Sequence, residues 1–283
     1  VGSEMCIRDR TIAPYIKNKL VYPAVLSVDE GGNFVIPLLS GHIGGANGFA
    51  KVLAKVIKAT PVVTTATDVN KLFAVDEWAA RNNMIINSMK AAKDFAAALV
   101  DGQEVGLFTD YPIISALPRQ IVLKDKGVTG LAITKNRNVN PFDLTVQLWP
   151  RNIYLGIGCR RGTTLESIET LVLPKLKELG IDLRTIVGVA SVDLKKDEAG
   201  LLNFAAKYNW EISFFTAEEL QNAAGEFSSS DFVKSVVGVS NVCERSAVLA
   251  ANNGSIISSK CSLNGVTLAV AEADIVLDFE KLS

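Results

Sequence analysis

The chain has one histidine in 283 residues, and its four cysteines are scattered without a Cys-x-x-Cys pair. A structural zinc site draws its ligands from closely spaced Cys and His, so this scarcity argues against one. Lys and Arg number 29 against 30 Asp and Glu, which lacks the basic excess of a general nucleic-acid surface. No apolar run approaches the ~20 residues of a membrane span. The sequence therefore predicts a protein of the reducing cytoplasm with no nucleic-acid or membrane partner.

The organisation of the chain is read from its composition and hydrophobic periods. The first ten residues, VGSEMCIRDR, have neither the apolar run of a signal peptide nor a regular period, and we interpret residues 1–10 as an unreliable start. Beyond them we expect a partial N-terminal domain over 11–68, a middle domain over 69–150 and a C-terminal domain over 151–283. The stretch LWPRN, residues 148–152, is the expected linker.

Strands and helices alternate in the expected N-terminal domain. PAVLSVD and NFVIPLL predict strands, and a helix follows from about Ala46 to Lys58, where apolar residues recur at helical spacing. These apolar residues are Phe49, Val52, Leu53, Val56 and Ile57. TPVVTTATD predicts a buried strand ending in polar residues. This strand-helix-strand order is typical of a parallel sheet.

The remaining units also alternate. In the middle domain we expect helices near 74–82 and 88–100, strands at 104–108, 120–124 and 130–135, and a loop over TKNRNVNPFD. In the C-terminal domain we expect strands at 153–157, 185–190, 211–215, 235–239, 255–259 and 266–271, and helices at 164–179, 197–208, 216–224 and 242–253. The predicted fold class is α/β, with an N-terminal strand-helix-strand unit, a middle α/β unit and a separate C-terminal α/β domain.

Three strand-to-helix turns share a glycine-rich design, in LLSGHIGGAN, YLGIGCRRGTTLE and VVGVSNVCERSA. Glycine lets backbone N–H groups approach a ligand, and a helix N-terminus favours an anion. Arg160 and Arg161 in the second turn suit carboxylates. The competing interpretation is structural, with glycine for chain geometry and with capping boxes from Thr163 to Glu166 and from Asn241 to Glu244. Three such turns in one chain favour a ligand with several anionic groups.

A nucleotide-binding α/β protein is a weaker interpretation. Gly156, Gly158 and Gly162 give GxGxxxG, one residue off the dinucleotide spacing, and no GxxxxGK[ST] occurs.

The motifs in combination resemble one family. TIAPYI, SGHIGGANGFA and VVTTATDVN…FAVDEWA resemble the N-terminal and middle regions of the cobalt-precorrin-5A hydrolases of anaerobic cobalamin biosynthesis. YLGIGCRRGTTLESIE, VASVDLKKDEAGLL, GVSNVCERSAVLAA and KCSLNGVTLAVA resemble the C-terminal domain of that family. The resemblance runs from about Thr11 to about Ala273, and the family has a further βα portion before IAPYI.

This resemblance implies a reaction and a substrate. Water opens the δ-lactone of cobalt-precorrin-5A, acetaldehyde leaves, and cobalt-precorrin-5B remains. The cobalt is carried by the substrate, so no cofactor and no metal site of the protein are expected. The acetate and propionate arms of the substrate are the anionic groups that the three turns would suit. A homodimer or contact with neighbouring pathway enzymes stays open.

Two residues are candidates for the chemistry that the resemblance implies. A histidine side chain has an unperturbed pKa of ~6.5, so His42 suits a general base, and Asp68 at a strand end would orient it or act as acid or base. The backbone N–H groups of Gly44, Gly45 and Ala46 are candidate oxyanion donors. Substrate binding or a structural role for His42, and a helix N-cap role for Asp68, remain alternatives.

The candidate substrate-binding residues come from the three turns and their neighbours. They are Ser40, Gly41, Gly44, Gly45, Asn47, Thr65, Thr67, Gly158, Arg160, Arg161, Lys195, Glu198, Ser240 and Glu244. Cys159 beside Arg160 is better explained as a packed cysteine than as a nucleophile, because no second histidine exists to pair with it. A non-catalytic tetrapyrrole-binding or carrier protein of the same pathway is the alternative function, since a carrier needs anion contacts but no base.

Overall fold

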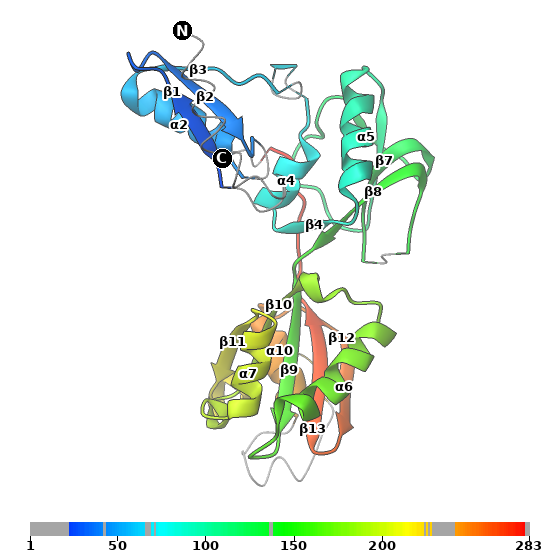
Figure 1. The fold of residues 1–283 in the computed structure, drawn as a ribbon. Coiled ribbons are helices and arrows are strands. Elements are labelled where there is room, and N and C mark those ends of the chain that lie inside the picture. Colours follow the sequence, from blue (N-terminus) through cyan, green and yellow to red (C-terminus); the bar gives the residue numbers. More distant parts are fainter. Residues whose placement is uncertain are drawn as a thin grey trace.

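The computed structural model describes residues 23–41, 44–65, 69–70, 72–135, 138–223, 225, 227 and 241–280. Three sheets form within these ranges, one in each of three successive units (Figure 1). Helices and strands alternate along most of the chain, which confirms the predicted α/β class. None of the helices in these ranges is long and apolar enough to cross a membrane.

The N-terminal unit is a three-stranded sheet covered by one helix. β1 (Val25–Val28) and β2 (Phe34–Leu39) form an antiparallel hairpin, and β2 continues through α2 (Ala46–Ile57) to β3 (Thr60–Pro61), which pairs parallel to β2. The β2–α2–β3 crossover is the predicted strand-helix-strand unit. The long buried strand expected over TPVVTTATD is wrong, because β3 has two residues and both are exposed. Pro61 has no N–H to donate, which suits a short edge strand.

α2 buries a different face from the one that its large apolar residues mark. Its buried residues are Ala46, Asn47, Ala50 and Ala54, and of these Ala50 and Ala54 pack in one core with Val35 of β2. Phe49, Val52, Val56 and Ile57 are instead between 41% and 74% exposed. Small side chains let the helix approach the sheet closely, so alanine rather than valine lies at the contact.

The middle unit is a five-stranded sheet in the order β4-β8-β7-β5-β6. Its elements are α4 (Val75–Arg81), β4 (Met84–Ile86), α5 (Met89–Val100), β5 (Val105–Thr109), β6 (Ile121–Leu123), β7 (Gly127–Ile133) and β8 (Phe142–Pro150). β4 and most of β8 were not expected as strands. β8 starts at Phe142, inside the predicted loop TKNRNVNPFD, and its end overlaps the predicted linker.

The chain returns to the middle unit after the last strand of the C-terminal domain. Leu277 and Phe279 are buried in the middle core, and the Phe279 ring stacks on Trp78 with centroids 4.7 Å apart. Trp78 Nε1 also donates to the Asp278 carbonyl at 2.9 Å, and Leu277 bridges to Ile113. Residues 275–279 therefore complete the middle core, although we predicted them as part of the C-terminal domain. The alternation of Ile275, Leu277 and Phe279 is the pattern of an extended segment with one buried face.

The C-terminal domain is a five-stranded sheet in the order β11-β10-β9-β13-β12. Its strands are β9 (Ile153–Cys159), β10 (Ile186–Val192), β11 (Glu211–Phe215), β12 (Ser255–Leu263) and β13 (Val266–Glu272). Its helices are α6 (Leu165–Glu178), η2 (Leu183–Thr185), η3 (Asp193–Lys195), α7 (Ala199–Lys207), α8 (Ala217–Gln221) and α10 (Val242–Ala250). These agree closely with the predicted elements, and the strand expected at 235–239 lies outside the described residues.

Helices cover both faces of this sheet. Along β13, Val266, Leu268 and Val270 pack in the core with α6 and α7, whereas Ala269 and Ala271 pack in the core with α10. Successive strand residues point to opposite faces, so α10 lies on the other side from α6 and α7. β9 and β10 run parallel, and β13 lies antiparallel to β9. The C-terminal domain extends away from the other two units (Figure 1).

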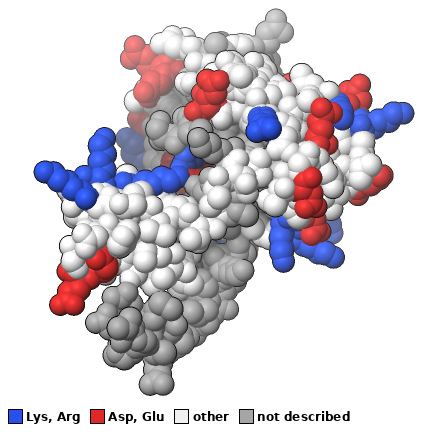
Figure 2. Space-filling model, turned by 90° about the horizontal axis from the view of Figure 1, so that it is seen from above, with Lys and Arg blue, Asp and Glu red and all other residues white. Residues whose placement is uncertain are grey.

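Charges of both signs occur over the face of the molecule seen from above (Figure 2). This distribution accords with the balance of 29 basic and 30 acidic residues in the chain.

Candidate functional site

The first glycine turn joins two of the predicted site residues. Asn47, at the start of α2, is 2% exposed, and its Nδ2 donates to Thr65 Oγ1 at 3.0 Å. The bond fixes the turn after β2 against the segment that follows β3. His42, Thr67 and Asp68 lie outside the described residues, so their roles stay predictions.

The glycines of this turn have a packing role. A Cβ on Gly41 would lie 2.9 Å from Asn47 Oδ1, and one on Gly44 would lie 2.2 Å from the Ser40 Cβ. Gly45 is the N-cap of α2 with φ 75°, a left-handed conformation that favours glycine. The turn therefore needs glycine for its own geometry, whether or not a ligand binds there.

The first N–H groups of α2 are used within the turn. Ala46 N–H donates to the Ser40 carbonyl at 3.0 Å, and Asn47 N–H donates to the Gly41 carbonyl at 2.9 Å. The prediction that Ala46 supplies an oxyanion donor is therefore wrong, because its proton already has an acceptor. The N–H groups of Gly44 and Gly45 remain the candidate donors.

The second turn holds a carboxylate of the protein itself. Glu198 is 6% exposed, and its Oε1 accepts a bond from the Gly162 N–H at 2.8 Å. Lys195 Nζ donates to the other oxygen at 3.3 Å. Two predicted site residues, Lys195 and Glu198, thus meet at the turn after β9. Glu198 occupies a position where the sequence predicted a ligand anion, which supports the structural interpretation of this turn.

The two arginines of this turn differ in their contacts. Arg161 pairs with Asp197 at 3.1 Å, with both side chains at least 70% exposed, and the bond from Arg161 lowers the pKa of the Asp197 carboxyl. Arg160 lies over Gly265, where a Cβ would come 2.8 Å from Arg160 Cδ, and its N–H donates to the Gly265 carbonyl. Gly158 faces Thr267, whose Oγ1 would be 2.6 Å from an added Cβ.

Two local predictions at this turn have different outcomes. The N-cap of α6 is Thr164, whose Oγ1 accepts from the Ser167 N–H at 3.3 Å, so the capping box expected from Thr163 to Glu166 is wrong. Thr163 Oγ1 instead donates to the Arg160 carbonyl at 2.7 Å.

Burial raises the pKa of the half-buried Cys159 thiol, with Lys195 acting in the opposite direction. A protonated, partly buried thiol agrees with a packed cysteine.

The third turn is held by internal bonds. Asn241 is the N-cap of α10, as predicted, and its side chain also donates to Glu244. Glu244 is 2% exposed, and its Oε1 accepts from the Lys260 N–H at 2.7 Å. Sequence reasoning missed Lys260, because no local signal connects a β12 backbone to a helix cap. Ser240 lies outside the described residues.

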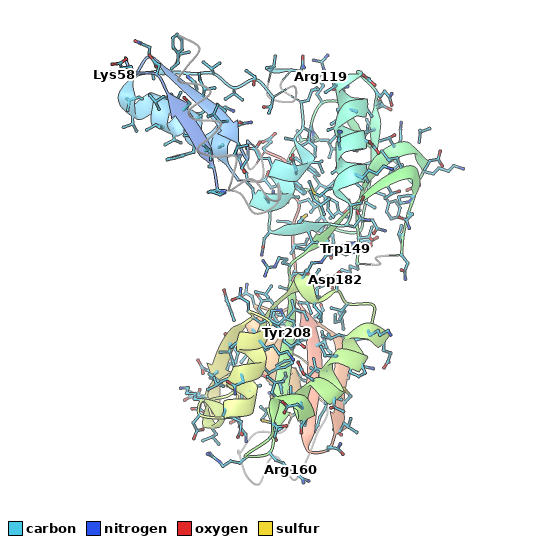
Figure 3. The ribbon with its side chains drawn as sticks, in the orientation of Figure 1. Lys58, Arg119, Trp149, Arg160, Asp182 and Tyr208 are labelled. Atoms are coloured by element: carbon cyan, nitrogen blue, oxygen red, sulfur yellow. The ribbon has the colours of Figure 1, made fainter. Side chains whose placement is uncertain are left out.

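The structure does not bring all the predicted residues to one place. Arg160 lies at the end of the C-terminal domain that is remote from the middle unit (Figure 3), whereas Asn47 and Thr65 belong to the N-terminal unit. The described members of the predicted set therefore lie in two separate parts of the molecule, the N-terminal unit and the C-terminal domain. Among the described residues, no three His, Cys, Asp or Glu side chains group to hold a metal ion.

Comparison with known proteins identifies the family. Three family models match in succession: the N-terminal region of cobalamin synthesis G at 3–68, the cobalamin biosynthesis central region at 73–150, and the C-terminus of cobalamin synthesis G at 153–271. A cobalt-precorrin-5A hydrolase of Salmonella typhimurium is 34% identical, over 93% of this chain and 78% of its own length. The enzyme of that name from Priestia megaterium is 31% identical, over 93% of this chain and 75% of its own length.

A solved structure is also similar, that of a cobalamin biosynthesis protein G homolog from Sulfolobus solfataricus. It is 24% identical and has a TM-score of 0.39, over 97% of this chain and 81% of that one. From the three successive family matches and the two curated relatives, the chain belongs to the cobalt-precorrin-5A hydrolase family of cobalamin biosynthesis.

Proposed function

We propose that the chain hydrolyses cobalt-precorrin-5A, opening its δ-lactone and releasing acetaldehyde to leave cobalt-precorrin-5B. The observation that carries the proposal is the match to all three regions of the family in their order along the chain. Relatives at 31% and 34% identity are named for this hydrolysis. Cobalt belongs to the substrate, so the proposal asks for no metal ligand from the protein.

The reaction has two steps, lactone opening and loss of the two-carbon fragment. Water adds to the lactone carbonyl and the acyl–oxygen bond breaks, giving a carboxylate and an alcohol. The carbon that bears this alcohol then becomes the carbonyl carbon of acetaldehyde, and its bond to the macrocycle breaks. The macrocycle keeps the electron pair and takes up a proton. A base near neutral pKa and donors for the developing oxyanion serve both steps.

We assign these tasks to the first glycine turn. His42 takes the proton of the attacking water, Asp68 orients the imidazole, and the N–H groups of Gly44 and Gly45 face the oxyanion. Support comes from the Asn47–Thr65 bond, since Thr65 precedes Asp68 by three residues and Asn47 follows His42 by five. Arg160 lies at the remote end of the C-terminal domain, so the carboxylate contacts predicted for Arg160 and Arg161 are not part of this step.

The assignment of His42 is tested with two variants. His42→Gln keeps a hydrogen-bonding group but takes up no proton near neutral pH, and Lys55→Gln changes an exposed residue of α2 as the matched control. Single-turnover release of acetaldehyde from cobalt-precorrin-5A is measured from pH 5 to 8. We expect a loss of ~10²–10⁴-fold for His42→Gln with substrate affinity retained, and parental rates for Lys55→Gln.

Two outcomes would contradict the proposal. Near-parental release by His42→Gln would leave His42 as a positioning or binding residue. Tight binding of cobalt-precorrin-5A by the parent without acetaldehyde above background would favour the carrier function.

A further inference from the structure

A cavity of about 330 Å³ lies where the middle unit meets the C-terminal domain. Its lining residues come from both: Tyr111, Thr134, Lys135 and Pro150 on one side, and Ile153, Leu179, Ile181, Ile257 and Glu272 among those on the other. Trp149 and Asp182 mark this junction in Figure 3. The volume is at the lower end for a small-molecule pocket, so it suits a small ligand or one arm of a larger one.

The polar side of the cavity centres on a buried carboxylate. Glu272 is 7% exposed, and its Oε1 accepts from Tyr111 Oη at 2.8 Å and from Asn152 Nδ2 at 3.1 Å. Burial and the neighbouring Glu272 raise the pKa of the Tyr111 phenol well above its ordinary value. Tyr111 therefore stays a neutral donor, and Glu272 keeps two bonds on one oxygen.

Lys135 is the cation among the described lining residues of the cavity. Its Nζ lies 3.5 Å from Glu272 Oε2 and 5.9 Å from the centre of the Tyr111 ring, while its side chain is 53% exposed. An ammonium group has three N–H donors, and the long contact with Glu272 uses one of them. Asp110 is nearby, but it is exposed and accepts from the Lys135 backbone N–H rather than from the ammonium. Lys135 thus has donors left for an acceptor that enters the cavity.

The rest of the lining includes four apolar side chains. Ile153 begins β9, Leu179 and Ile181 follow α6, and Ile257 lies on β12. A ligand that fills the cavity would place hydrocarbon against these side chains and its polar end against Lys135. Among the described lining residues Lys135 is the one cation, and a phosphate, which carries more charge than a carboxylate, is a poorer fit. A metal cation is poorer still, because donors already occupy both Glu272 oxygens.

We propose that this cavity, defined by Lys135, Glu272, Tyr111 and the four apolar residues, binds a carboxylate carried on a short apolar stem. The carboxylate accepts from Lys135 Nζ, and the stem packs on Ile153, Leu179, Ile181 and Ile257. The ligand is either a free short-chain acid or one arm of a larger polycarboxylate. The site stands on the contacts of the junction and does not depend on the proposed hydrolysis.

The first measurement uses pentanoate as the free acid and pentanamide as its neutral counterpart. Saturation-transfer NMR titrations of the full chain give the two dissociation constants. We expect pentanoate to bind more tightly than pentanamide. We expect Lys135→Met, which keeps the stem and removes the charge, to weaken pentanoate binding by about tenfold or more, the effect of a lost charge-assisted bond. Lys126→Met, at an exposed position before β7, is the matched control and should change nothing.

A second variant should change the affinity for pentanoate in the opposite direction. Glu272→Gln keeps an acceptor for Tyr111 and Asn152 but releases Lys135 from its charged partner, so pentanoate binding should tighten severalfold. Urea unfolding of each variant shows that it is folded. Equal affinity in the parent and in Lys135→Met, or no detectable pentanoate binding by the parent, would overturn the proposal.

A third ligand distinguishes a free acid from one arm of a larger polycarboxylate. Cobyrinic acid, a corrinoid whose arms end in carboxylates, is titrated by calorimetry into the parent and Lys135→Met. Binding far tighter than that of pentanoate and weakened by Lys135→Met assigns the site to an arm of a larger ligand. If Lys135→Met leaves cobyrinic acid binding unchanged but weakens pentanoate binding, the site is assigned to a free acid. These titrations do not depend on acetaldehyde release, so failure of the proposed hydrolysis would leave their result unchanged.

Discussion

At the scale of single residues, three glycines in YLGIGCRRGTTLE have separate structural causes. A Cβ on Gly156 would lie 1.8 Å from the Cys243 carbonyl oxygen, so this glycine lets α10 pack directly on β9. Gly162 has φ +77°, and Gly158 faces the Thr267 side chain. The spacing that resembles a nucleotide motif thus follows from helix packing, a left-handed turn and a strand contact.

The Gly156 contact gives a stability prediction. Gly156→Ala must displace the backbone of α10, and we expect the free energy of unfolding to fall by about 2 kcal/mol or more, as for overpacked cores. Gly158→Ala is the control, since the atom in its way is a threonine hydroxyl that can rotate, and it should cost less than about 1 kcal/mol. Urea unfolding followed by Trp210 fluorescence measures both. Equal losses in the two variants would contradict the role of the α10 contact.

Tyr208 gives a prediction for alkaline pH. Its Oη donates to Glu169 Oε1 at 2.6 Å, and burial, with this bond, raises the pKa of the phenol from 10.0 to about 12. A raised pKa means that the folded state favours the protonated phenol, so the stabilisation is fully present below pH 10 and is lost as the pH rises towards 12. In Tyr208→Phe the free energy of unfolding should fall less steeply than in the parent as the pH rises from 10 towards 12. Trp210, stacked on Tyr208 at 4.6 Å, is the fluorescent reporter, and an unchanged slope in Tyr208→Phe would contradict the assignment.

At the scale of elements, helices and strands are predicted best where the hydrophobic periodicity and the positions of the turn residues agree. The C-terminal domain alternates cleanly, and strand β11 lies over 211–215, as predicted. β8 was missed because Asn140-Pro141 is a strong turn signal directly before it. Asn47, Thr65, Lys195 and Glu198 were all predicted as substrate-binding residues, but their contacts with one another were not predicted. The bonds themselves depend on tertiary packing that no local pattern records.

α2 shows how a correct period can leave the buried face unspecified. Ala50 is 0% exposed, whereas Val56 on the solvent-facing side of the same helix is 74% exposed. We expect Ala50→Leu to destabilise the N-terminal unit by about 1–3 kcal/mol through overpacking, and Val56→Thr to change it by less than about 0.5 kcal/mol. Hydrogen exchange of the α2 amides, read by mass spectrometry, measures both. Faster exchange in Val56→Thr than in Ala50→Leu would contradict the observed orientation of the helix.

At the scale of the whole molecule, the chain passes between the middle unit and the C-terminal domain twice, at 150–153 and again after Glu272. The second passage places Phe279 against Trp78 in the middle core. We expect Phe279→Ala to lower the unfolding free energy by about 3 kcal/mol or more, as for other large buried aromatics. Val276→Ala is the control, since Val276 is 52% exposed. Fluorescence of Trp78 should change in the first variant only, and a neutral Phe279→Ala would contradict the assignment of the tail to this core.

The return of residues 275–279 also sets an order of folding during synthesis. The ribosome delivers β4 to β8 long before Leu277, so the middle core waits for its last residues while the whole C-terminal domain emerges. The C-terminal domain holds its own cores, and the last strand that they need, β13, ends at Glu272, before Leu277 and Phe279. We expect it to fold first, although it is made second, and the middle unit to close around Leu277 and Phe279 afterwards. Contacts between residues so distant in sequence form slowly, because the chain must first bring its ends together.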